Sequence, residues 1–356
     1  MSTQRNRGEW SEIYVACSLV AYGQLQIFGD GNFLIEGVSS ISREYQILRK
    51  GNEAIVKGPL IEERFCISYF EKAAKIIRDA IMRGGTGEGT FSIDKLGSFE
   101  SSTGLDQICG GRSRKSDIVV HLIDRYSDQK GYRTFSIKSL MGAPPTLFNV
   151  SHSSAITFQL IGPSYANLAF DINSINTVKE RIRRLSEIGF IFIPIEFSSK
   201  VFKSNLQMID TNFPELYACS ILAYYLGKSS ILKEVIKGIE NGSVRNVCKM
   251  CDPNNFAHMN LELKFGQFLY DITLGMNSAT KWDGRWDVDG GYIIVGENGE
   301  IVAHPFLNEQ NLRDFLLNKT KFDTPSTSRH DFGRVEYDYS GVHFIRLMAQ
   351  IRFTTR

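Results

Sequence analysis

The chain has 356 residues, enough for one large domain or two average ones, and 42% of them are hydrophobic, so a sizeable core can form. Its 41 basic and 39 acidic residues leave a net charge of only +2, which excludes a global basic excess as the means of binding nucleic acid. No stretch approaches the roughly 18 apolar residues of a membrane span, and no apolar signal-peptide region follows Met1, so we expect a cytoplasmic protein with no membrane partner.

The chain begins with a predicted amphipathic helix over residues 8–23, where Gly23 suits the C-terminal end. Glu9 and Glu12 lie three positions apart and therefore share one face of its first turns. Both can be solvated residues favoured by the helix dipole, or one can turn inward as a metal ligand. Glu12 is the better candidate ligand because the apolar face of the helix begins directly after it, at Ile13.

Two predicted strands, residues 116–123 and 135–139, are separated by a polar segment that suits a hairpin loop. If the two strands pair antiparallel, Asp117 and Lys138 lie at the same end of the pair. A carboxylate that holds Mg²⁺ beside a lysine ammonium is what metal-assisted phosphodiester hydrolysis requires. The alternative is an ordinary hairpin that carries an Asp and a Lys by chance.

Polar and basic residues flank these strands and are candidates for contacting DNA phosphates. Arg112, Arg114 and Lys115 come just before Asp117, and Ser139 and Asn149 come after Lys138. The alternative is that both segments are exposed loops without a ligand.

The rest of the chain alternates helical and strand-like patterns and ends in hairpins. Residues 24–65 suit hairpins, and helices are expected over 67–82, 177–188, 205–242 and 255–276, strands over 155–161 and 190–195, and hairpins over 292–304 and 337–353. The six cysteines are scattered, mostly in apolar runs, which suits reduced core residues. Cys248 and Cys251 form a CxxC pair with only His258 near in sequence, so a structural zinc site is the weaker alternative.

An Asp, a hairpin and then acid-x-Lys is the pattern of the PD-(D/E)XK nucleases, which residues 117–138 resemble except that Ser136 stands where the acid is usual. Further segments, taken together in order, resemble the HpaII-type restriction endonuclease family: 8–12, 115–118, 135–139, 146–149, 282–284, 290–295, 318–322, 325–330 and 350–353. These segments reach both ends of the chain.

The resemblance implies an α/β (α+β) protein with a PD-(D/E)XK core, a mixed sheet flanked by helices, and a C-terminal region with hairpins. It implies a bacterial type II restriction endonuclease that needs Mg²⁺ and cuts double-stranded DNA at a short palindrome, CCGG in the founding enzyme. The enzyme would act as a homodimer or a monomer, paired in biology with a DNA methyltransferase. We expect residues 1–165 to form the catalytic core and residues 166–356 to complete it and help recognise DNA, unless the chain is one domain.

Within that resemblance, Asp117, Lys138, Ser136 and Glu12 are the expected catalytic residues, with Asp117 and Glu12 holding the metal. Ser136 is not expected to ligate the metal directly, and Glu12 is expected to supply the missing acid. Base reading is expected from the second half of the chain, with Arg285, Arg329 and His330 as candidates, unless they only bind phosphate or cap a turn. Two other functions stay open: a repair or junction-resolving nuclease, and a non-catalytic DNA-binding protein.

Overall fold

The computed structural model of the chain describes residues 4–29, 31–84, 89–109, 116–123, 130–286, 288–306 and 309–354. The chain divides into two compact units. Unit 1 comprises residues 1–145 and 286–312, and unit 2 comprises residues 146–285 and 313–354. Both units contain sheets and helices, so the predicted α+β class is confirmed. The expected domain division at residue 165 stays a prediction.

Unit 1 is built on one sheet that, within the described residues, contains nine strands in the order β1-β12-β11-β7-β6-β2-β3-β4-β5. The strands are β1 (Gln24–Ile27), β2 (Asn32–Ser39), β3 (Gln46–Lys50), β4 (Glu53–Gly58), β5 (Ile61–Cys66), β6 (Ile118–Ile123), β7 (Lys130–Ser139), β11 (Gly291–Val295) and β12 (Ile301–Pro305). Strand β11 runs parallel to β7, and β6 runs antiparallel to β7. Because β1 also pairs with β2, the strands from β1 to β2 form a closed ring of pairings.

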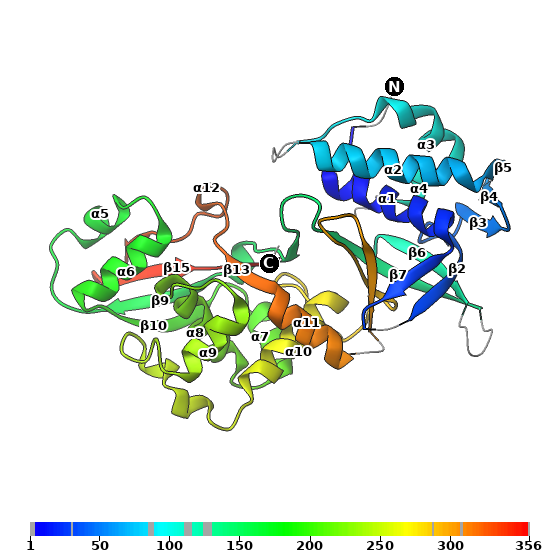
Figure 1. The fold of residues 1–356 in the computed structure, drawn as a ribbon. Coiled ribbons are helices and arrows are strands. Elements are labelled where there is room, and N and C mark those ends of the chain that lie inside the picture. Colours follow the sequence, from blue (N-terminus) through cyan, green and yellow to red (C-terminus); the bar gives the residue numbers. More distant parts are fainter. Residues whose placement is uncertain are drawn as a thin grey trace. The chain divides into compact units, whose positions relative to one another are not determined.

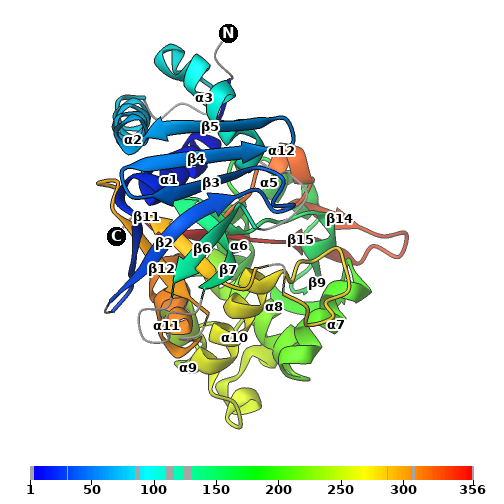
Figure 2. The same ribbon diagram turned by 90° about the vertical axis from the view of Figure 1, so that its right-hand side faces the viewer.

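Helix α1 (Arg7–Tyr22) packs on this sheet, and helix α2 (Ile67–Arg83) lies alongside α1 (Figures 1 and 2). Gly23 ends α1 in the left-handed conformation, with φ of 64°, which glycine adopts without a Cβ penalty. The apolar face predicted for α2 is buried as expected at Phe70, Ala73, Ala74, Ile77 and Ile81. The remaining helical segments of unit 1 are η1 (Asp94–Leu96), α3 (Gly97–Thr103) and α4 (Leu105–Ile108).

Unit 2 contains two smaller sheets, with the orders β10-β9-β15-β14 and β13-β16-β8 in the described residues. Their strands are β8 (Thr146–Phe148), β9 (Ile156–Ile161), β10 (Ile191–Phe197), β13 (Thr320–Asp323), β14 (Val335–Tyr337), β15 (His343–Leu347) and β16 (Gln350–Phe353). Its helical segments are η2 (His152–Ser154), α5 (Leu168–Asn173), α6 (Val178–Ile188), α7 (Lys200–Ile209), α8 (Phe213–Leu226), α9 (Leu232–Glu240), η3 (Lys249–Cys251), η4 (Pro253–Phe256), α10 (Leu261–Leu274) and α12 (Thr327–His330). Helix α11 (Glu309–Lys319) begins in unit 1 and ends in unit 2.

The C-terminal hairpin differs from the prediction over 337–353. The hairpin is β14 with β15, whereas β16 pairs with β13 and β8 in the other sheet. The apolar pattern of residues 350–353 predicts a strand correctly, but a strand pattern does not name its partner.

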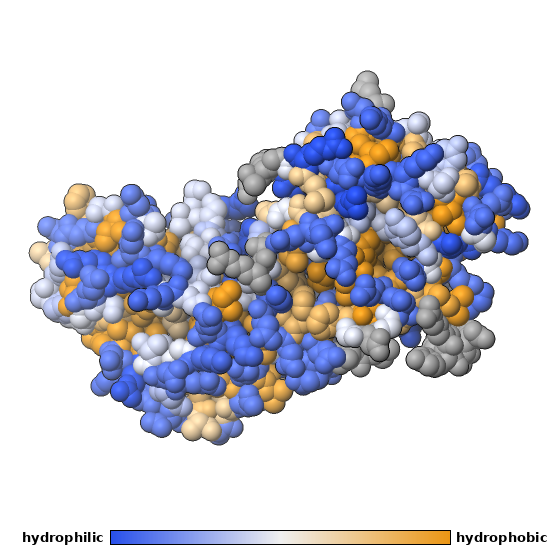
Figure 3. Space-filling model, viewed as in Figure 1, coloured by the Kyte–Doolittle hydropathy of each residue, from blue (hydrophilic) through white to orange (hydrophobic). Residues whose placement is uncertain are grey.

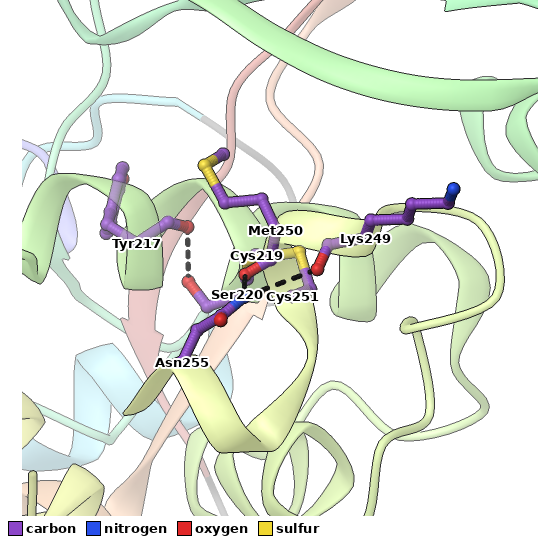
Figure 4. Close-up of a disulfide and its surroundings, with 7 residues drawn as sticks. All are labelled: Tyr217, Cys219, Ser220, Lys249, Met250, Cys251 and Asn255. Carbon is purple, nitrogen blue, oxygen red and sulfur yellow. Dashed lines mark hydrogen bonds between the residues drawn. A yellow bond between two sulfur atoms is a disulfide. The ribbon is translucent and has the colours of Figure 1, made fainter. Parts of the chain in front are cut away.

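The expectation that the cysteines are reduced is wrong for Cys219 and Cys251, which form a disulfide between α8 and η3 (Figure 4). The two residues are 32 positions apart, so their proximity arises from tertiary packing that the CxxC spacing does not reveal. Cys248 is a buried free thiol. The described residues contain no group of three or more His, Cys, Asp or Glu side chains placed to hold a metal ion, so zinc at Cys248 and Cys251 has no support.

The surface in Figure 3 is mainly hydrophilic, with apolar side chains scattered between charged ones. Large apolar side chains lie mostly inside; Trp10, Phe70 and Phe135 in unit 1 are fully buried. None of the helices in the described part of the chain is long and apolar enough to cross a membrane.

Candidate active site

Asp117 lies directly before β6 and is held against β7. Its backbone N–H donates to the Phe135 carbonyl at 2.9 Å, which extends the β6–β7 ladder by one residue. Its Oδ2 accepts hydrogen bonds from the Ile137 backbone N–H at 2.6 Å and from the Ser136 hydroxyl at 3.0 Å. Among the described residues, Oδ1 accepts no hydrogen bond, so it is the oxygen left for a cation.

Ser136 and Lys138 lie two positions apart on β7 and therefore project from the same face of the sheet. Ser136 is only 2% exposed, and its hydroxyl donates to Asp117. Ser136, which stands where PD-(D/E)XK nucleases usually have an acid, thus helps to orient the Asp117 carboxylate. Lys138 is half-buried and acts electrostatically on Asp117, so Asp117 and Lys138 lie together at one end of the β6–β7 pair, as the hairpin prediction requires.

Glu12 reaches this place from α1, whose start is fixed by a capping box. The Asn6 side chain accepts from the Glu9 backbone N–H at 3.0 Å, and the Glu9 carboxylate accepts from the Asn6 N–H at 2.9 Å. Arg5, just before the helix, forms a buried ion pair with Glu100 at 3.1 Å. Glu9 is thereby used in the cap, whereas Glu12 lies one turn further into the helix, which packs on β7.

Burial disfavours ionisation of both the Glu12 and the Asp117 carboxyl groups. Burial raises the pKa of Glu12 to about 8, the Asp117 carboxylate adds to the rise, and the Lys138 ammonium opposes it. Burial also raises the pKa of Asp117, opposed first by Lys138 and then by its hydrogen bonds from Ile137 and Ser136. A cation bound between the two carboxylates would lower the free-energy cost of ionising them at this partly buried position.

The donor set at this place fits Mg²⁺. Glu12 Oε2 is buried without a hydrogen-bond partner in the described structure, and Asp117 Oδ1 also accepts none there. Mg²⁺ favours oxygen ligands, usually takes one or two carboxylates and keeps several waters. Glu12 and Asp117 supply two carboxylates.

Tyr292 on β11 lies beside these residues, although no sequence motif predicts a role for it. It stands beside Ser136 in the parallel β7–β11 register, and the Lys138 ammonium lies 5.7 Å from the centroid of its ring. The sequence around Tyr292 indicates only an apolar strand at residues 291–295. The pairing of that strand with β7 is seen only in the structure.

The candidate DNA-binding residues are distributed over both units. Ser139, in unit 1, follows Lys138 on β7, and its hydroxyl accepts from the Met141 N–H at 3.3 Å. Exposed side chains in unit 2 include Asn149 after β8, Arg329 in α12, and Arg285, which forms an ion pair with Asp283 at 3.5 Å. His330, at the end of α12, is half-buried. Arg112, Arg114 and Lys115 lie outside the described residues.

Two comparisons with known proteins each give a match over nearly the whole length of the chain. The profile of the HpaII restriction endonuclease family matches residues 6–353. The type II restriction enzyme HpaII of Haemophilus parainfluenzae is 34% identical over 362 residues, which covers 98% of this chain and 98% of that protein. No solved structure gives a significant match.

Proposed function

Because this chain belongs to the HpaII restriction endonuclease family, and is therefore a type II site-specific deoxyribonuclease, we propose that it hydrolyses double-stranded DNA at the palindrome CCGG in a reaction that requires Mg²⁺. The observation that carries the proposal is the cluster of Glu12, Asp117 and Lys138 at one end of the β6–β7 pair. The site CCGG is taken from the family resemblance.

We propose that the cluster is a PD-(D/E)XK site in which Glu12 replaces the acid absent at Ser136. Asp117 and Glu12 hold the ion, and Ser136 orients Asp117 through its hydrogen bond of 3.0 Å. The chemistry that Mg²⁺ supplies when bound is neutralisation of phosphate charge and activation of water. Lys138 places a positive charge and a donor where the attacking water and the charged phosphate oxygens lie during in-line attack.

The DNA contacts are divided between phosphate binding and base reading. Contacts to the DNA backbone are assigned to Arg112, Arg114, Lys115, Ser139 and Asn149, because basic, hydroxyl and amide side chains can bind phosphates without regard to sequence. Base reading is assigned to Arg285, Arg329 and His330, because arginine can pair with guanine O6 and N7 in the major groove. In biology the enzyme works in the bacterial cytoplasm with a DNA methyltransferase that protects the same site.

Digestion of DNA of known sequence tests the proposed function. With Mg²⁺, a plasmid that contains several CCGG sites should give discrete fragments whose mapped ends lie at CCGG, and EDTA should prevent cleavage. A matched duplex that carries GGCC in place of CCGG is the control and should stay intact. Nicking that follows DNA structure would favour a repair nuclease, and binding without cleavage would favour a non-catalytic DNA-binding protein.

Arg329, one of the two arginines assigned to base reading, gives a separate prediction. Arg329→Ala should lower discrimination between CCGG and duplexes with one substituted G·C pair by about 5- to 150-fold, the size of one arginine–guanine contact. Cleavage of the cognate and substituted duplexes by the wild type and the variant measures this ratio. Arg184→Ala, which removes an exposed arginine paired with Glu187 on α6, is the control. If Arg329→Ala weakens binding equally for all duplexes, Arg329 binds phosphate and does not read bases.

A further inference from the structure

We propose that Tyr292 is a positioning residue for the reaction, and that the face of its ring holds the Lys138 ammonium in place. The inference rests on the proposed function, because the role of Lys138 is itself part of that proposal. Tyr292 contacts neither water nor phosphate in this assignment and acts only through Lys138.

The β7–β11 register places the ring beside the lysine. Tyr292 is opposite Ser136 in this parallel pair, and Ile294 is opposite Lys138. Side chains two positions apart on a strand share a face, so Ser136, Lys138 and Tyr292 project together from the sheet. The ammonium lies 5.7 Å from the ring centroid, within the range of about 6 Å in which the ring quadrupole attracts a cation.

The ring is itself held in place. Tyr292 is only 3% exposed, and the Phe306 ring meets it edge-on, with centroids 6.4 Å apart and an interplanar angle of 81°. Burial raises the pKa of the Tyr292 phenol, so the side chain stays neutral at ordinary pH and offers the lysine a ring face, not a phenolate.

Lys138 needs such a partner because its stem is flexible. A lysine side chain carries roughly 2 kcal/mol of rotamer entropy, and its ammonium is a point charge with no fixed geometry. In the described part of the chain, no carboxylate forms an ion pair with the Lys138 ammonium, and the Asp117 and Glu12 carboxylates act on it only from a longer distance. A buried ring on the neighbouring strand restricts where the ammonium can lie while leaving its protons free to donate.

The first test compares two substitutions. Tyr292→Phe keeps the ring and should cleave CCGG DNA within about twofold of the wild type, whereas Tyr292→Leu should lower the single-turnover rate by about 5- to 30-fold. The dissociation constant for DNA, measured with Ca²⁺ in place of Mg²⁺, should not change in either variant. A Leu variant that cleaves as the wild type, or a Phe variant as slow as Leu, would overturn the role of the ring.

The second test keeps the shape of the side chain and so does not depend on how Tyr292→Leu folds. Phenylalanine with one, two or three fluorines at position 292 weakens the ring quadrupole stepwise, and the logarithm of the cleavage rate should fall with each fluorine. A flat series contradicts the proposal. Lys138→Ala is measured beside it: if that variant cleaves as the wild type, the proposed role of Lys138 fails, whereas if it is inactive and the series is flat, only the role of Tyr292 fails.

Discussion

Asp117→Asn and Lys138→Ala should each lower the rate of DNA cleavage more than 100-fold while leaving the fold largely intact. In the proposed mechanism, Lys138→Ala removes a positive charge that stabilises the phosphate as it becomes more negative, and Asp117→Asn removes a carboxylate that would hold the Mg²⁺. Either loss is expected to cost about 3 kcal/mol or more in the barrier. Asparagine is preferred to alanine at position 117 because its side-chain carbonyl can still accept the hydrogen bonds from Ile137 and Ser136. Asp117→Asn therefore removes the charge but keeps the hydrogen bonds that anchor residue 117 to β7.

The chain offers a close control for this prediction. Asp289 Oδ1 accepts hydrogen bonds at 2.6 Å from both the backbone N–H and the hydroxyl of Thr134, so it anchors the same strand in the same way as Asp117. Unlike Asp117, it is exposed, and it forms an ion pair with Arg133 at 3.7 Å. Asp289→Asn should therefore cleave DNA at nearly the wild-type rate.

Cleavage rates with saturating Mg²⁺, together with thermal unfolding of each variant, measure the effect. Wild-type rates in Asp117→Asn or Lys138→Ala would remove those residues from the catalytic assignment. Equal losses in Asp117→Asn and Asp289→Asn would mean that strand anchoring, and not charge at the site, explains the inactivity.

The sequence predicts the placement of those candidate site residues that depend on local pairing. Asp117 and Lys138 flank a short hairpin, and antiparallel pairing of adjacent strands necessarily brings the two ends together. The helix that carries Glu12 is likewise predictable, because Gly23 and the apolar periodicity that precedes it mark its end.

The parts that the sequence does not predict depend on contacts between distant segments. Tyr292 joins the site through parallel pairing with β7, across more than 150 residues of chain. Cys251 pairs with Cys219 and not within its own CxxC, and β16 leaves the predicted hairpin for another sheet. Periodicity identifies a strand or a helix, but the choice of partner depends on tertiary packing that no local pattern encodes.

Glu12 on α1 is the second residue whose substitution is expected to have a large effect on cleavage. Glu12→Gln should lose most cleavage activity and no longer recover it as Mg²⁺ is raised, because one of two proposed ligands is gone. Glu9→Gln should keep the activity and lose only a few tenths to about 1 kcal/mol of stability, because Glu9 accepts from the Asn6 N–H in the helix cap. Cleavage rates titrated with Mg²⁺ compare the two variants.

Protein stability without metal tests the same assignment independently of activity. The folded-state pKa of Glu12, about 8, lies above its ordinary value of 4.5, so the folded protein binds a proton more tightly than the unfolded chain between these pH values. The free energy of unfolding in EDTA should therefore fall as pH rises from about 4.5 to about 8, by about 1.4 kcal/mol for each unit of pKa difference. Glu12→Gln should remove this part of the slope, and Glu9→Gln should not.

Mg²⁺ should restore the stability that the wild type loses as pH rises. An ion that binds only the folded protein stabilises it by mass action, so the stability of the wild type at pH 8 should rise with Mg²⁺ concentration, while that of Glu12→Gln should rise much less. If Glu9→Gln loses activity and Glu12→Gln keeps it, the wrong carboxylate has been assigned. If both variants keep their activity and respond to Mg²⁺ as the wild type does, Asp117 holds the ion with water or with a ligand elsewhere in the chain.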